Sequence, residues 1–170
     1  MNTDDFLSVK ELLSKPQKIA IVTHRNPDGD AYGASLALYL FLKKLDHQVS
    51  VVSPNDCPEF LKWLPGESDI VIFEKNKKEG SRILKEAALV FKHDFNAFHR
   101  LGETMKDLME QIDPVYIMID HHQQPDDYAA YSYVDPSMSS TSQMIYQFIE
   151  KMEQIDLVDK DVATCLYAGI

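Results

Sequence analysis

Several features are scarce or missing in this 170-residue chain, and their absence narrows its class. Only two cysteines occur, Cys57 and Cys165, and they have neither metal-ligand nor redox spacing, so a reducing cytoplasm is expected. No apolar run is long enough to span a bilayer and no signal peptide is recognisable, which predicts a cytoplasmic protein without membrane contact. No repeat or long linker marks a boundary, and 45% hydrophobic residues suffice for one globular domain.

Positive charge is also scarce. The chain has 17 lysines and arginines against 27 acidic residues, a formal net charge of −10. This balance argues against a broad basic footprint for long duplex nucleic acid. It remains compatible with a small nucleotide bound through metal ions, because such ions invert the local field.

Hydrophobic periodicity predicts alternating strands and helices. Strands are expected at residues 19–23, 48–53, 69–73, 88–91, 115–119 and 131–134, and helices at 4–14, 31–45, 58–66, 75–86, 103–112, 143–152 and 160–170. Such alternation indicates an α/β fold, with a mainly parallel sheet between helices.

The stretch from Thr23 to Ala31 connects a predicted strand to a helix and carries His24, Asp28 and Asp30. An imidazole and two carboxylates that converge in one loop suit Mn²⁺, Mg²⁺ or Zn²⁺. Taken alone, the two aspartates also fit an ordinary turn followed by a helix N-cap.

Asp120, His121 and His122 follow the predicted strand at 115–119, so they form a second polar group at a strand end. Adjacent histidines are also common in solvated loops. Both polar groups follow the carboxyl end of a predicted strand, and open α/β sheets bind ligands at that end of their strands. This shared location favours a binding site.

Asp94 follows the predicted strand at 88–91 and adds a third acidic group at that edge, with Arg100 nearby. Arg100 fits a surface cation, or a guanidinium clamp for phosphate. The hydroxyl residues Ser139 to Ser142 precede a helix, where they fit an N-cap or an anion-binding helix start. Trp63 is interpreted as a packing residue rather than a base-stacking platform, because no basic cluster accompanies it.

The imidazole and carboxylate side chains at these strand ends are more numerous than the ligands that a single metal ion needs from a protein. Two ions about 3.5–4 Å apart clamp the attacking and leaving oxygens of a phosphoryl displacement. His122 would then face the substrate and stabilise charge or protonate the leaving oxygen. The expected reaction is phosphoester hydrolysis by a metal-activated water, with these candidate metal ligands: His24, Asp28, Asp30, Asp94 and His121.

The segments His24-x-x-Pro27-Asp28-Gly29-Asp30-Ala31, Asp94 and Asp120-His121-His122 together resemble the DHH phosphoesterase superfamily. The residues around Asp94 and Arg100 are most similar to its nano-RNase branch, RecJ-like oligoribonucleases that also dephosphorylate 3'-phosphoadenosine 5'-phosphate. The resemblance implies a Rossmann-like three-layer domain with two Mn²⁺ ions, for which Mg²⁺ or Co²⁺ can substitute. His24 and Asp28 would hold one ion, Asp30 and His121 the other, and Asp94 both.

The chain departs from the family in two respects. His93 stands where the family usually has an apolar residue, which suggests altered packing or an extra ligand. The chain also stops at Gly169-Ile170, before the family's Thr-Asp-Thr-Gly-like motif and its smaller C-terminal substrate-binding domain. Residues 1–170 are therefore expected to be the N-terminal catalytic domain of a longer protein, and this part alone is expected to be weak or inactive.

Three functions remain open at this level: a phosphodiesterase or phosphatase for short oligonucleotides or a nucleoside bisphosphate, an inorganic pyrophosphatase, and a non-catalytic nucleotide- or metal-binding module. Gly29 between the two acids disfavours the pyrophosphatase. The expected partner is the small substrate, and a homodimer is left open.

Overall fold

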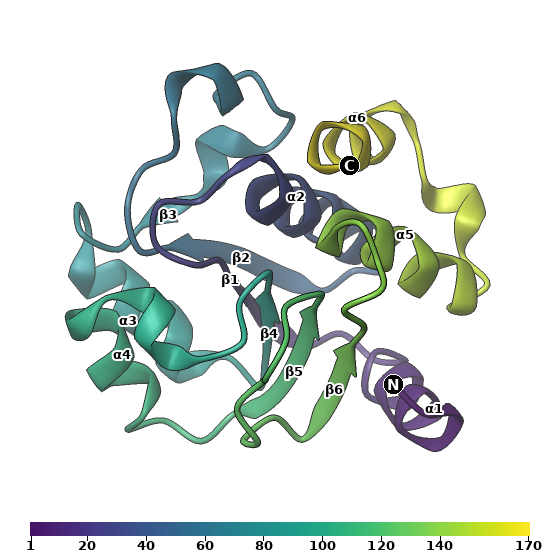
Figure 1. Ribbon diagram of the computed structural model, residues 1–170, viewed down its shortest axis with the longest axis horizontal. Coiled ribbons are helices and arrows are strands. Elements are labelled where there is room, and N and C mark those ends of the chain that lie inside the picture. Colours follow the sequence, from purple (N-terminus) through teal and green to yellow (C-terminus); the bar gives the residue numbers. More distant parts are fainter.

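The computed structural model describes residues 1–170 and shows one parallel sheet between two layers of helices (Figure 1). The strands lie in the order β3-β2-β1-β4-β5-β6, and every neighbouring pair is parallel. This architecture confirms the expected α/β fold. The strands are β1 (Lys18–Val22), β2 (Gln48–Ser53), β3 (Val71–Ile72), β4 (Leu89–His93), β5 (Val115–Asp120) and β6 (Tyr131–Val134).

Helices connect most of the parallel strands, whereas β5 and β6 are joined by a loop. No helix is long and apolar enough to cross a membrane. The α-helices are α1 (Thr3–Leu12), α2 (Gly29–Lys44), α3 (Lys77–Glu86), α4 (Glu103–Met109), α5 (Thr141–Lys151) and α6 (Lys160–Gly169). Short 3-10 turns are η1 (Glu59–Leu61), η2 (Glu67–Asp69), η3 (Phe98–Leu101) and η4 (Ile155–Leu157).

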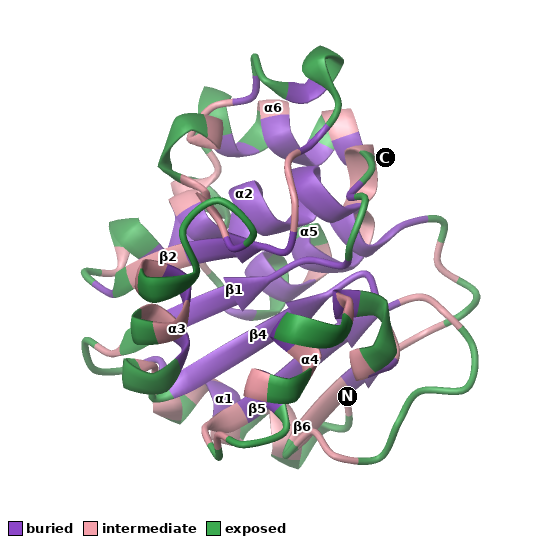
Figure 2. Cartoon of the chain, turned by 90° about the vertical axis from the view of Figure 1, so that its left-hand side faces the viewer, coloured by how far each residue is buried: buried purple, intermediate pink, exposed green.

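Alternation along the central strand explains the two layers. Ile19 and Ile21 of β1 join the core beneath α1, α2, α5 and α6, whereas Ala20 and Val22 join the core beneath α3 and α4. Successive strand side chains point to opposite faces, so one apolar run supplies both cores. The central strands are accordingly buried between the helices (Figure 2).

The segment from Pro58 to Gly66 differs from the expected helix. Only one 3-10 turn, at Glu59–Leu61, forms in this segment, and Gly66 adopts the left-handed conformation at φ 82° before the next turn. Trp63 is 63% exposed and Phe60 is 70% exposed, so the packing interpretation of Trp63 is wrong within this chain. Because η2 occupies residues 67–69, β3 is limited to Val71 and Ile72.

β4 is longer than expected and includes Lys92 and His93, both fully buried. His93 Nδ1 lies 3.3 Å from the Ser35 hydroxyl, and its ring packs edge-on against Phe91. The residue therefore packs in the core against α2. Burial lowers the pKa of His93, while the nearby Asp94 charge acts in the opposite direction.

We expect His93→Gln to reduce the acid sensitivity of folding. The unfolded imidazole takes up a proton below its ordinary pKa of 6.5, whereas the folded imidazole stays neutral, so folding weakens as the pH falls from 6.5. The free energy of unfolding is expected to fall by about 1.4 kcal/mol for each pH unit below 6.5 because of this one imidazole. Urea unfolding at pH 7.5, 6.5 and 5.5 measures it, and the variant is expected to lose less stability than the wild type. Equal losses in both proteins would contradict the prediction.

Candidate metal centre

The first candidate ligands lie at the carboxyl end of β1, beside β4. The strand order changes direction between these two strands, and this is the crevice where such sheets bind ligands. His24 is 4% exposed, and its Nδ1 lies 2.8 Å from the Arg25 carbonyl oxygen. A hydrogen bond from Nδ1–H to that carbonyl leaves the Nε2 lone pair available, in the manner of metal-binding histidines. Nε2 lies 3.5 Å from Asp94 Oδ2.

Asp28 is the N-cap of α2, as the alternative interpretation proposed. Its Oδ1 accepts hydrogen bonds from the backbone amides of Asp30 at 3.1 Å and Ala31 at 3.0 Å. Its other carboxylate oxygen makes no hydrogen bond within the chain. The capping role and a ligand role are therefore compatible, because they use different oxygens.

Asp94 occupies the centre of the cluster. It is 2% exposed and has a left-handed backbone with φ 62°, a conformation that is uncommon outside glycine, asparagine and aspartate. Its Oδ1 lies 3.4 Å from His121 Nε2 and 3.7 Å from His122 Nδ1. Burial opposes the charged form of Asp94, but His24, His122 and the Thr141 hydroxyl together lower the pKa of Asp94. Burial likewise opposes the charged imidazole of His24, but Asp94, the Arg25 carbonyl and Asp28 together raise the pKa of His24.

The two histidines after β5 are held in different ways. His121 Nδ1 lies 3.3 Å from the Met138 carbonyl, which directs Nε2 toward Asp94 and Asp30. His122 Nδ1 lies 2.7 Å from Asp120 Oδ1, and the His122 amide donates to the same oxygen at 3.2 Å. Asp120 is fully buried, so it fixes the ring orientation of His122 and leaves Nε2 without a partner in the chain.

The start of α5 binds an anion that belongs to the chain itself. The amides of Thr141 and Ser142 donate to Asp30 Oδ2 and Oδ1, each at 2.7 Å, and Ser140 caps the helix by accepting from the Gln143 amide. This helix start was expected to cap itself or to bind an external anion. In the structure, the Asp30 carboxylate accepts hydrogen bonds from two of its free backbone amides instead. Burial and then the Asp94 charge raise the pKa of Asp30, against the lowering effect of the two amides.

Arg100 lies in η3, beside the first loop, because its carbonyl accepts from the Arg25 amide at 2.8 Å. The side chain is exposed, and no ion pair or hydrogen bond within the chain fixes its guanidinium. The structure therefore brings the backbone of Arg100 to the rim without joining its side chain to the cluster.

The donors form two groups that share Asp94. One contains His24, Asp28 and Asp94, the other Asp94, His121 and His122, and within each group the ligand atoms lie within 4.8 Å of one another. Asp30 is close as well, with Oδ2 3.6 Å from His121 Nε2. Imidazole and carboxylate donors in this arrangement fit two divalent ions such as Mn²⁺. Nδ1 of His122 is already bound to Asp120, and both oxygens of Asp30 accept hydrogen bonds from amides of α5.

The sequence pattern missed two contributions to this site. It did not assign Asp120 as the partner of His122, although Asp120 lies in the same motif. It treated Thr141 and Ser142 only as hydroxyl residues, and no pattern indicated that their amides meet Asp30.

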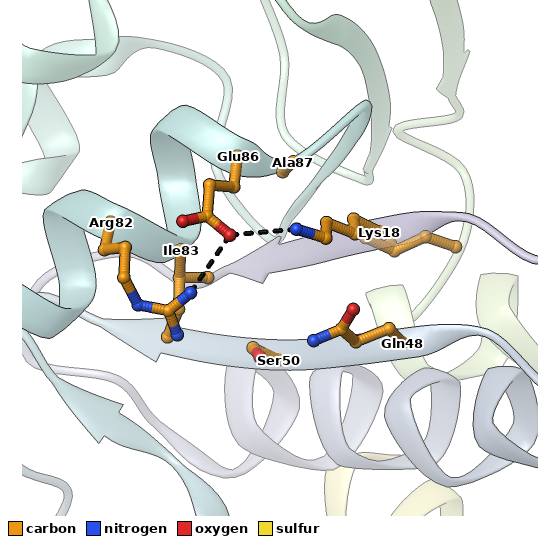
Figure 3. Close-up of a pocket in the computed structure, with 8 residues that line it drawn as sticks. Lys18, Gln48, Ser50, Arg82, Ile83, Glu86 and Ala87 are labelled. Carbon is orange, nitrogen blue, oxygen red and sulfur yellow. Dashed lines mark hydrogen bonds and ion pairs between the residues drawn. The ribbon is translucent and has the colours of Figure 1, made fainter.

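A polar hollow between β1, β2 and α3 lies away from this centre (Figure 3). Glu86 accepts from Lys18 and from Arg82, both at 3.0 Å, so its charge is already paired. The hollow has a volume of about 30 Å³, which is room for a few water molecules but not for a nucleotide. Lys18 and Gln48 begin their strands, which places this hollow at the edge of the sheet opposite to the metal-ligand candidates.

Comparison with known proteins identifies the family. A family model described as "DHH family, N-terminal domain" matches residues 18–170. The bifunctional oligoribonuclease and PAP phosphatase NrnA of Thermus thermophilus is 33% identical over 132 residues, which cover 78% of this chain and 36% of that protein. A probable manganese-dependent inorganic pyrophosphatase of Streptococcus agalactiae is 28% identical over 160 residues, 90% of this chain and 47% of that protein.

A solved structure has nearly the same fold. The crystal structure of an exopolyphosphatase-related protein from Bacteroides fragilis has a TM-score of 0.96 and 36% sequence identity, covering 99% of this chain and 49% of that one. The chain thus spans half or less of the length of these relatives. The matches confirm the family resemblance that the motifs indicated.

Proposed function

Because this chain belongs to the DHH family, we propose that it forms the catalytic domain of a metal-dependent phosphoesterase for short oligonucleotides or 3'-phosphoadenosine 5'-phosphate. The observation that carries the proposal is the pair of imidazole–carboxylate groups that share the buried Asp94. They lie in the crevice where the sheet order changes direction, which is a binding position in this type of fold. A merely structural ion pair would need only one of these groups.

In this proposal His24 and Asp28 hold one ion, Asp30 and His121 hold the other, and Asp94 contacts both. Mn²⁺ is the proposed ion, supported by the donor set and by the description of the Streptococcus relative as manganese-dependent. Mg²⁺ and Co²⁺ are the expected substitutes. When bound, the ions supply positive charge that activates the attacking water and stabilises the phosphoryl oxygens.

The remaining groups act on the substrate. Asp120 accepts from Nδ1–H and fixes the His122 ring, so that in its doubly protonated form the ring could donate its Nε2–H proton to a phosphoryl or leaving oxygen. The amides of Thr141 and Ser142 hold Asp30 in one orientation, which positions its oxygens before any ion binds. Arg100 at the rim supplies a guanidinium for a second phosphate group.

The substrate class is supported by the Thermus relative, an oligoribonuclease and PAP phosphatase. The formal charge of −10 favours a small ligand over a long duplex. Pyrophosphate is a second candidate because of the Streptococcus relative, but that relative is less similar in sequence over its match. A non-catalytic module would bind the same ions without turnover.

The deciding experiment measures hydrolysis of a dinucleotide, 3'-phosphoadenosine 5'-phosphate and pyrophosphate, with and without Mn²⁺. It compares this chain with a form extended by the downstream domain that the resemblance implies. Manganese-dependent release of mononucleotide or of phosphate from the nucleoside bisphosphate is the expected result. Preferential cleavage of pyrophosphate would instead identify a pyrophosphatase. Metal binding without turnover in the extended form would identify a binding module.

A further inference from the structure

Lys92 is the one lysine of the chain that is fully buried. Its Nζ makes no hydrogen bond, although a buried ammonium ordinarily requires one. It faces three aromatic rings, with distances to the centroids of 4.5 Å for Phe95, 4.8 Å for Phe98 and 3.9 Å for Tyr128. Ring faces attract a cation through their quadrupole, so these residues form an aromatic cage around Lys92.

The cage joins two loops that are distant in sequence. Phe98 belongs to η3, which also carries Arg100, and Tyr128 lies in the loop that follows His121 and His122. Their rings stack with centroids 4.1 Å apart. Lys92 lies against both rings and belongs to β4, the strand that leads into Asp94.

Hydrogen bonds hold the same two loops together. Asn96 Nδ2 donates to the Gln123 carbonyl at 2.7 Å, and the Asp126 amide donates to the Asn96 carbonyl at 2.9 Å. Tyr116 of β5 adds edge-on contacts to Phe98 and Tyr128, each with centroids 5.7 Å apart. The two loops therefore pack as one unit, and the Lys92 side chain lies inside it.

We propose that Lys92 is a positioning residue whose aromatic cage fixes the loop of Arg100 relative to the loop of His122, and thereby sets the binding of the anionic substrate. This inference rests on the proposed function, in which Arg100 and His122 contact the substrate. Lys92 is expected to contact neither substrate nor metal, because it is fully buried among the rings. Its effect is therefore expected on substrate affinity rather than on the chemical step.

The test uses Lys92→Met, which keeps a long flexible side chain and removes the cation. Hydrogen exchange followed by mass spectrometry is expected to show about tenfold faster exchange in residues 96–102 and in residues 122–130 together. Exchange in α2 should not change. Lys85→Met, at an exposed lysine without an ion pair, is the matched control and is expected to behave as wild type in both loops.

The kinetic measurement uses the form extended by the downstream domain, with the dinucleotide and Mn²⁺. Lys92→Met is expected to raise KM about five- to tenfold while kcat and the affinity for Mn²⁺ change less than twofold. A general loss of stability would instead lower the active fraction, and so kcat, without changing KM. If Lys92→Met does not fold, Tyr128→Leu removes one ring of the cage and is expected to give the same pattern.

If hydrogen exchange in both loops is the same in Lys92→Met as in the wild type, the proposal is overturned, whatever the activity of the variant. The proposal is also overturned if exchange becomes faster but KM does not change. Failure of the proposed function is distinguishable, because then the wild type itself shows no turnover. In that case the hydrogen-exchange experiment still decides whether Lys92 holds the two loops together. The affinity for Mn²⁺ is measured separately and reports on the metal centre.

Discussion

Replacing Asp94 by asparagine is expected to abolish both metal binding and turnover. Asp94 is the one residue that belongs to both donor groups, and its two oxygens approach different histidines. A neutral amide is a weaker ligand and offers only one oxygen, so both ions lose a charged donor. We expect turnover to fall at least about a thousandfold, equivalent to about 4 kcal/mol of transition-state stabilisation.

Isothermal titration with Mn²⁺ and steady-state hydrolysis of the dinucleotide measure these effects. Asp28→Asn is the informative comparison, because Asp28 belongs to one group only and its loss is expected to spare the other ion. Glu59→Gln is the neutral control, since that side chain is 89% exposed and lies outside both groups. Two ions bound with wild-type affinity in Asp94→Asn would contradict the shared role of Asp94.

Gly33→Ala is expected to destabilise the fold, although alanine ordinarily stabilises the interior of a helix. A Cβ atom on Gly33 would lie 2.6 Å from the Cys165 carbonyl oxygen and 2.9 Å from the Gly169 amide nitrogen. Both atoms belong to the α6 backbone, so no side chain can rotate away and the two helices must separate. We expect a loss of about 1–3 kcal/mol, against the gain of about 0.5–1 kcal/mol that helix propensity alone predicts.

Chemical denaturation of the metal-free protein measures this change without reference to activity. Tyr167→Ala provides the matched control on α6, because that side chain is 85% exposed and its loss is expected to stay within about 0.5 kcal/mol. Increased stability of Gly33→Ala would show that α2 and α6 have room to separate at little cost.

Much of the site follows from local sequence. A strand that ends in a polar loop brings its side chains to the carboxyl edge of the sheet, and parallel strands share that edge. The sequence therefore indicated that His24, Asp28, Asp94 and His121 would meet, and the structure places them together. Asp30 also lies near His121, although its oxygens are bound by amides of α5.

Local sequence also determined the alternation of strands and helices, since a period of two or 3.6 residues reports which faces of an element are buried. It did not determine the partners of those faces. The bond between Thr141 and Asp30 joins residues 111 positions apart, and the cage around Lys92 takes its rings from separate loops. Gly33 lies against the α6 backbone, where a Cβ atom would not fit. Such contacts depend on strand order and helix packing, and a pattern within one segment contains no information about which distant segment will cover it.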